Sequence, residues 1–211
     1  MDVFNISLMK WYVILALVSF SICLLSCIYH FLKIIRLGKP VDFSEPIGDV
    51  GSAVAYSFTG GMSPNKKESA YLHKPTYTAG LIYHAGTFLS IALFFCFLFN
   101  IYFSEIIDTI ISGFLVISGF CGIGILIKRI VKKELKSISN PDDYISNFLV
   151  TVFQFITAVS LNFPNPVYYV LTSILFLYLP LGKLKHTIYF FAARYHLGLF
   201  YGKRAVWPPK H

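Results

Sequence analysis

The fold class follows from one apolar stretch of the chain, residues 165–180, which read NPVYYVLTSILFLYLP. Together with the aromatic residues up to position 190, it is long enough to cross a bilayer, which needs roughly 20 predominantly apolar residues. Lipid offers no hydrogen-bond partner to an open backbone, whereas a helix satisfies its own backbone groups. The stretch therefore predicts a membrane-spanning helix over residues 166–190.

The rest of the chain repeats this pattern. Of its 211 residues, 56% are hydrophobic and only 13% are charged, and the apolar residues fall into blocks of bilayer-spanning length. The sequence predicts an all-α fold, an integral membrane bundle of five transmembrane helices in a single domain over 1–211. The expected helices lie at about 11–32, 77–103, 106–127, 145–163 and 166–190.

The basic residues predict the orientation of this bundle. The net charge is +8, yet 17 of the 18 lysines and arginines lie in three segments, which are 33–76, 128–144 and the tail from 183 onward. All three fall on one side of a five-helix topology, so the positive-inside rule places the N-terminus outside and the C-terminus in the cytoplasm. We expect a multi-pass protein of the cell inner (cytoplasmic) membrane, surrounded by lipid bilayer and with no nucleic-acid partner.

The segment 33–76 is too long for a minimal connection between two helices. Its residues 48–69, GDVGSAVAYSFTGGMSPNKKES, place apolar and aromatic side chains among glycine, serine and proline. Disordered linkers are usually richer in charge. We expect 33–76 to be a cytoplasmic docking loop for a partner protein, with a solvated linker as the alternative.

Two histidines lie where the ligands of a haem iron would be expected. His84 falls inside the predicted second span, within GLIYHAG, and an ionisable residue in a membrane helix needs a partner. Gly80 and Gly86 would let a flat group lie against the helix beside the imidazole. His186 ends the motif PLGKLKH. At ~1.5 Å per residue both histidines reach the inner leaflet, where they would bind one iron from opposite sides; a hydrogen bond between helices is the other reading of His84.

A second histidine pair is the basis of an alternative with two haems. His73 precedes His84 by eleven residues and His196 follows His186 by ten, which are axial offsets of about 16 and 15 Å. At ~100° per residue, eleven steps return to nearly the same helix face, whereas ten steps miss it by about 80°. The offsets therefore match better than the facing directions.

Three motifs together resemble a known family. PLGKLKH at 180–186 is similar to a Pro-x-x-basic-x-x-His signature, GLIYHAG at 80–86 to a helix-two segment, and GIGILIKRI at 122–130 to the end of helix three. The chain resembles the respiratory nitrate reductase gamma subunit, a membrane cytochrome b, and the membrane cytochrome b subunits of heterodisulfide-reductase-type complexes. The resemblance covers roughly 77–200.

The resemblance implies a five-helix protein that binds two b-type haems through histidines of helices two and five. His84 and His186 match the ligands of the haem nearer the cytoplasm. The ligands of the outer haem would fall at Phe94 and Tyr168, whose side chains do not replace imidazole and would fill the vacated space. The sequence therefore predicts one haem b, with His84 and His186 as its axial metal ligands.

Other contacts of the haem and of a quinone are also expected. Lys183 and Lys185 could reach the haem propionates, or could simply anchor the chain at the inner surface. Tyr168, Tyr169 and Gln154 are candidate polar partners of a quinone head group, with ordinary hydrogen bonds between helices as the alternative.

The resemblance implies a haem b-containing membrane anchor subunit of a respiratory oxidoreductase complex. Such a subunit passes electrons between the quinone pool and a cytoplasmic iron–sulfur subunit joined to a catalytic subunit, so the chain serves electron transport and is not a complete enzyme. A transporter would need polar residues along several helices, where spans one, three and four carry almost none. A cofactor-free structural anchor would leave His84 and His186 unexplained.

Overall fold

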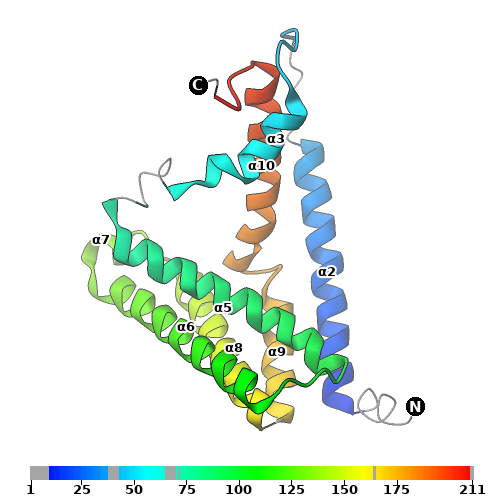
Figure 1. Cartoon of the computed structure of the whole chain (residues 1–211), viewed down its shortest axis with the longest axis vertical. Helices are drawn as coiled ribbons and strands as arrows, with labels where there is room; N and C mark the ends of the chain where they lie inside the picture. Colours follow the sequence, from blue (N-terminus) through cyan, green and yellow to red (C-terminus); the bar gives the residue numbers. More distant parts are fainter. Residues whose placement is uncertain (1–9, 38–42, 65–69, 71, 164, 210–211) are drawn as a thin grey trace. The chain divides into compact units, whose positions relative to one another are not determined.

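The structure, a computed structural model, describes all residues except 1–9, 38–42, 65–69, 71, 164 and 210–211 (Figure 1). In this part of the chain all regular elements are helices, which confirms the predicted all-α class. The elements are α2 (Trp11–Leu37), α3 (Val50–Phe58), η1 (Gly60–Met62), α5 (Lys74–Leu98), α6 (Glu105–Val131), α7 (Lys133–Ser137), α8 (Pro141–Asn162), α9 (Pro166–Tyr178), η3 (Lys183–Lys185) and α10 (His186–Lys203).

The contacts within the chain form two compact units. Unit 1 comprises Met1–Cys23 and Pro75–Leu184, and unit 2 comprises Leu24–Lys74 and Lys185–His211. Four helices, α2, α5, α6 and α8, are long and apolar enough to cross a membrane, and α9 and α10 add a fifth span only if they are taken together. The length and composition of these helices are compatible with a multi-pass membrane protein.

The predicted fifth span is not one continuous helix. Pro180 lacks a backbone N–H and its ring clashes with the carbonyl one turn back, so a helix does not continue through it. The N–H groups of Leu181 and Gly182 instead donate to the carbonyl of Tyr178, at 3.0 and 2.8 Å, and α10 begins only at His186. With 13 residues, α9 is about 20 Å long and too short to cross alone. The predicted helix over 166–190 is therefore a broken span or a re-entrant segment.

Unit 1 is held together by packing among its membrane helices. Figure 1 shows α6 and α8 running beside one another, and Leu93 of α5 is buried against Leu115 of α6 and Ala158 of α8. The first half of α2 contacts α5 and α9 through Phe20, whose ring centroid lies 5.3 Å from that of Phe176. Since lipid is as apolar as these side chains, close packing rather than water exclusion stabilises the contacts.

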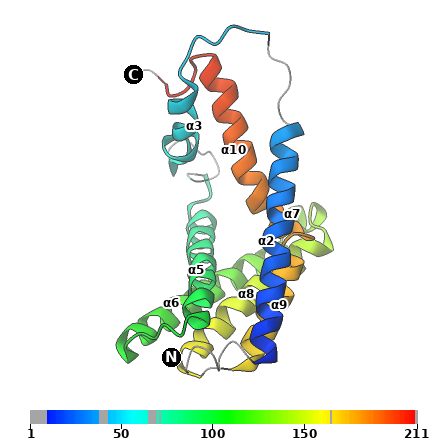
Figure 2. The ribbon, with the colours of Figure 1, turned by 90° about the vertical axis from the view of Figure 1, so that its right-hand side faces the viewer.

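Unit 2 contains a short helix that the sequence analysis treated as loop. α3 lies beside α10 (Figure 2), and two glycines of α10 permit the approach, since a Cβ at Gly202 would lie 2.7 Å from that of Ala53. Gly198 faces Val54 in the same way. The hydroxyl of Ser57 also donates to the carbonyl of Arg194 at 2.8 Å. Nine residues form a marginal helix in isolation, so the contact with α10 stabilises α3.

Candidate functional site

A layer of polar side chains joins α5 to α8 in the interior of unit 1. The hydroxyl of Tyr83 donates to the carbonyl of Asn147 at 2.9 Å and lies 3.0 Å from the hydroxyl of Thr151. The amide nitrogen of Gln154, a fully buried residue, donates to the carbonyl of Tyr83 at 2.9 Å and to the hydroxyl of Thr87 at 2.8 Å. Gln154, predicted as a quinone contact, thus fastens α8 to α5.

The polar content of α8 corrects one expectation. The fourth span was expected to carry almost no polar residues, but the buried side chains of α8 include Asp143, Ser146, Thr151, Gln154, Thr157 and Ser160. Several of them bond to neighbouring helices or to their own backbone, as Thr157 does to the carbonyl of Phe153 at 2.6 Å. The bonds to neighbouring helices, such as that of Gln154 to Tyr83, hold membrane helices together, on average by about 0.6 kcal/mol per bond. This polarity was missed because the span 145–163 was predicted from its apolar residues, which outnumber the hydroxyl and amide side chains among them.

His84 lies on the face of α5 that does not pack against α6 and α8. Its side chain is exposed, and its ring stacks on Phe88, with centroids 6.4 Å apart and 25° between the planes. Gly80 lies one turn earlier on the same face, and a Cβ there would meet no atom within 4 Å. Along this strip, Gly80 exposes the helix backbone, His84 carries an exposed imidazole, and Phe88 carries the aromatic ring on which that imidazole stacks.

Gly86 has a different role from the one the sequence suggested. It was expected to leave room for a flat group beside His84, together with Gly80. A Cβ at Gly86 would instead overlap the side chain of Ser118 and lie 3.1 Å from Gln154 Oε1. Two residues correspond to ~200° around a helix, which turns Gly86 toward α6 while His84 faces away. At Gly80, by contrast, an added Cβ would meet no atom within 4 Å, and its predicted role stays a prediction.

Aromatic rings surround Phe94 and Tyr168, the two positions at which the sequence analysis expected no haem ligand. Phe94 is fully buried, and its ring centroid lies 5.1 Å from that of Phe176. Tyr168 is 1% exposed and contacts the rings of Phe97 and Phe153, with centroids 5.2 and 6.2 Å away. Both side chains occupy packed positions between α5 and α9.

The other predicted histidines and Lys185 belong to unit 2. His186 is the exposed first residue of α10, and His73 is exposed just before α5. His196 is half-buried on α10, and its Nε2 has no hydrogen-bond partner among the described residues. His84 belongs to unit 1, so the structure describes the two predicted ligands of the first haem, His84 and His186, each within its own unit.

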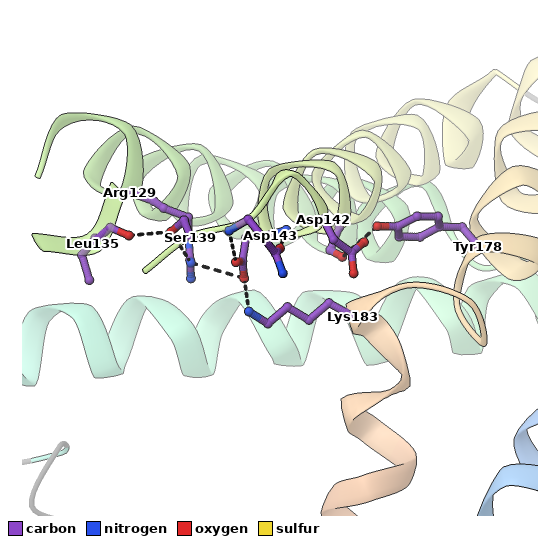
Figure 3. Close-up of polar contacts among 9 residues, drawn as sticks. Arg129, Leu135, Ser139, Asp142, Asp143, Tyr178 and Lys183 are labelled. Carbon is purple, nitrogen blue, oxygen red and sulfur yellow. Dashed lines mark hydrogen bonds and ion pairs between the residues drawn. The ribbon is translucent and has the colours of Figure 1, made fainter. Parts of the chain in front are cut away.

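An ionic cluster that the sequence analysis missed lies at the start of α8 (Figure 3). The side chain of Asp143 is 4% exposed; it binds the ammonium group of Lys183 and lies 3.3 Å from the guanidinium of Arg129. Asp143 also forms a capping box with Asn140, in which each side chain accepts the other residue's backbone N–H. Lys183 was predicted as a propionate contact. It lies in η3, after the turn that follows α9, and its ion pair with Asp143 joins this segment to α8.

A cavity of about 520 Å³ lies at the opposite end of unit 1. Tyr168 and Tyr169, two of the predicted quinone contacts, line it, whereas Gln154 does not. In the part of the chain that the structure describes, no group of three or more histidine, cysteine, aspartate or glutamate side chains is placed to hold a metal ion. Compared with known proteins, the chain matches no family model, no curated protein and no solved structure.

Proposed function

We propose that this chain is a haem b-containing membrane anchor subunit of a respiratory oxidoreductase complex. The observation that supports it is the strip on α5, where His84 stands on an exposed face with open space at Gly80. Packing within unit 1 uses the other face of α5, through Gly86 and through Tyr83, whose carbonyl accepts from Gln154 of α8. A flat macrocycle fits beside a glycine when the imidazole next to it reaches the iron.

His84 and His186 would hold the haem as its two axial ligands. The bound group supplies one-electron transfer, and the protein supplies ligation, orientation and an apolar surrounding. Phe88, stacked on His84, restricts the orientation of the imidazole. Lys185, beside His186, carries a charge suited to a propionate, whereas Lys183 is already bound to Asp143.

The outer level of unit 1 favours one haem over two. Phe94 and Tyr168 are buried among other rings, so a second macrocycle there would have to displace packed side chains. The alternative, a second haem held by His73 and His196, has one observation in its favour, which is the buried Nε2 of His196 without a partner among the described residues.

The proposed partners follow from the function. Electrons would pass between a quinone or quinol of the membrane and a cytoplasmic iron–sulfur subunit, which joins a catalytic subunit. Unit 2 is the proposed docking surface, because α3, from segment 33–76, and α10, from the basic tail, pack into one body. This body carries Arg194, Lys203 and Arg204. Tyr168 and Tyr169 remain predicted quinone contacts.

The visible spectrum of the purified chain or complex tests the proposal. We expect a b-type alpha band after dithionite reduction and about one haem per chain by pyridine haemochrome. His84→Ala and His186→Ala should each abolish the band, while His30→Ala, on α2, should retain it. A colourless, fully assembled protein would leave the cofactor-free anchor as the better reading. Two haems per chain, reduced to one by His196→Ala, would replace the single-haem version.

A further inference from the structure

The outer surfaces of α3 and α10, which pack together in unit 2, differ in chemistry. The exposed residues of α3 are Gly51, Ser52 and Ala55, and all three are small. Of the two helices, only α10 exposes large hydrophobic side chains. An exposed apolar face on a folded protein marks a contact with a partner or with a membrane when its side chains are contiguous. The body formed by α3 and α10 therefore has one side suited to water and one side suited to a more apolar environment.

The exposed hydrophobic side chains of α10 follow one side of the helix. Phe190, Leu197 and Phe200 are 38%, 38% and 50% exposed. Steps of seven and three residues keep side chains on neighbouring positions of one helix face. The side that packs against α3 is a different one, because Gly198, which is turned by ~100° from Leu197, faces Val54. The contacts with α3 therefore leave these three side chains uncovered.

Two arginines stack on the rings of this side of α10. Arg194 follows Phe190 by four residues and Arg204 follows Phe200 by four, and the guanidinium carbons lie 5.8 and 3.8 Å from the two ring centroids. A stacked guanidinium uses its plane and keeps its N–H donors at the edge, where they suit phosphate oxygens. No aspartate or glutamate occurs in residues 144–211. The outer face of α10, which comprises these two pairs and Leu197, thus combines hydrophobic side chains with positive charge alone.

Unit 2 begins inside a membrane helix. The helix α2 is long and apolar enough to cross a bilayer, and its second half, residues 24–37, belongs to unit 2. This helix therefore brings the unit to the edge of the bilayer, where the lipid phosphates lie. Arginine suits this depth, because its stem packs against apolar groups while its guanidinium binds phosphate. Aromatic and aliphatic side chains are accommodated there at the boundary between head groups and acyl chains.

We propose that the outer face of α10 binds the surface of a bilayer that contains anionic phospholipid, with the helix lying in the lipid–water interface. Phe190, Leu197 and Phe200 would enter the boundary of the acyl chains, and Arg194 and Arg204 would bind lipid phosphates. An acidic protein surface would match the arginines, but its carboxylates would lie against the three hydrophobic side chains. The outer face of α3 stays open to water and to the proposed partner subunit. The proposal does not depend on the haem.

Quenching of tryptophan fluorescence by brominated lipids tests the proposal in the full-length chain, reconstituted in nanodiscs. The two native tryptophans, Trp11 and Trp207, are replaced by phenylalanine. A single tryptophan is then placed on the outer face of α10 by Phe200→Trp or, as the control, on the outer face of α3 by Ala55→Trp. Relative to unbrominated lipid, we expect lipid brominated near the head group to quench Phe200→Trp about twofold or more and to leave Ala55→Trp unchanged.

A second arm of the experiment tests the charge. Brominated phosphatidylglycerol should half-quench Phe200→Trp at about a fifth or less of the mole fraction that brominated phosphatidylcholine needs, since each arginine near an anionic surface strengthens binding about fivefold. Arg194→Gln combined with Arg204→Gln should remove this preference. Lys133→Gln combined with Lys136→Gln, which removes two exposed charges from α7 in unit 1, should keep it.

Each other outcome would overturn the proposal. An unquenched Phe200→Trp would place the outer face of α10 in water or against a protein, and stronger quenching by lipid brominated deep in the acyl chains would show that α10 crosses the bilayer. Equal quenching of Ala55→Trp would remove the difference between the two faces. Equal mole fractions of the two lipids, or a preference kept without both arginines, would remove the phosphate contacts. All substituted positions of the first arm except Trp11 lie in unit 2, and circular dichroism checks that each variant is folded. If Phe200→Trp unfolds, Leu197→Trp gives the same measurement from the same face.

Discussion

At the scale of single residues, two glycines of α5 have different surroundings. Gly86 allows α6 to approach, whereas Gly80 faces open space. We expect Gly86→Ala to destabilise the protein by about 1–3 kcal/mol, because its Cβ would overlap Ser118. Thermal unfolding in detergent, followed by circular dichroism, measures the change. Gly80→Ala is the control on the same helix and should leave stability unchanged or slightly raised; equal losses in both variants would contradict the role given to Gly86.

A second prediction concerns the ionic cluster at the start of α8. Asp143 is nearly buried, whereas the side chain of Lys183 is 51% exposed. We expect Asp143→Asn to lower the free energy of unfolding by about 1–3 kcal/mol, because it removes two ion pairs and weakens the cap of α8. Lys183→Gln should cost about 1 kcal/mol or less, since an exposed ammonium is well solvated. A larger loss in Lys183→Gln than in Asp143→Asn would reverse this assignment.

At the scale of elements, the sequence predicts those helices whose position depends only on local composition. The apolar lengths of α2, α5, α6 and α8 are local, and these helices are where they were expected, with ends shifted by a few residues. The helix α3 was not predicted, because the surrounding segment 48–69 is rich in glycine and serine and because α3 is stabilised by α10, which lies far along the chain. The break after α9 was also not predicted. Pro180 and Gly182 of PLGKLKH lie just after the end of α9, but the sequence analysis used them only as part of a family motif and not as residues that end a helix.

The cap of α3 gives a prediction about pH. The Asp49 carboxylate accepts from the hydroxyl of Ser52 and from the N–H of Gly51, and these bonds hold the pKa of Asp49 below its usual value. A lowered pKa means that the cap stabilises α3 above the unfolded pKa, about 3.9, and is lost as the pH falls through the folded pKa. Hydrogen exchange of residues 50–58, corrected for the intrinsic rate, should therefore accelerate in acid. Asp49→Asn, a cap that does not titrate, should remove this pH dependence; acceleration equal to that of the wild type would point to another group.

At the scale of the whole molecule, the predicted orientation depends on how α9 and α10 behave together. If they form one broken span, the five spans place the termini on opposite sides, and the basic segments lie in the cytoplasm. If they form a re-entrant segment, the tail returns to the side of the membrane on which Ser104 lies.

We expect a membrane-impermeant maleimide to label Ser104→Cys in intact cells but neither Ser137→Cys nor Val206→Cys, all three positions being exposed. After lysis all three should react, which shows that each thiol is accessible. Labelling of both Ser104→Cys and Val206→Cys in intact cells would establish the re-entrant form. His186 would then start a helix outside the cytoplasmic half of the membrane, so the same experiment would also remove the premise on which His84 and His186 are paired.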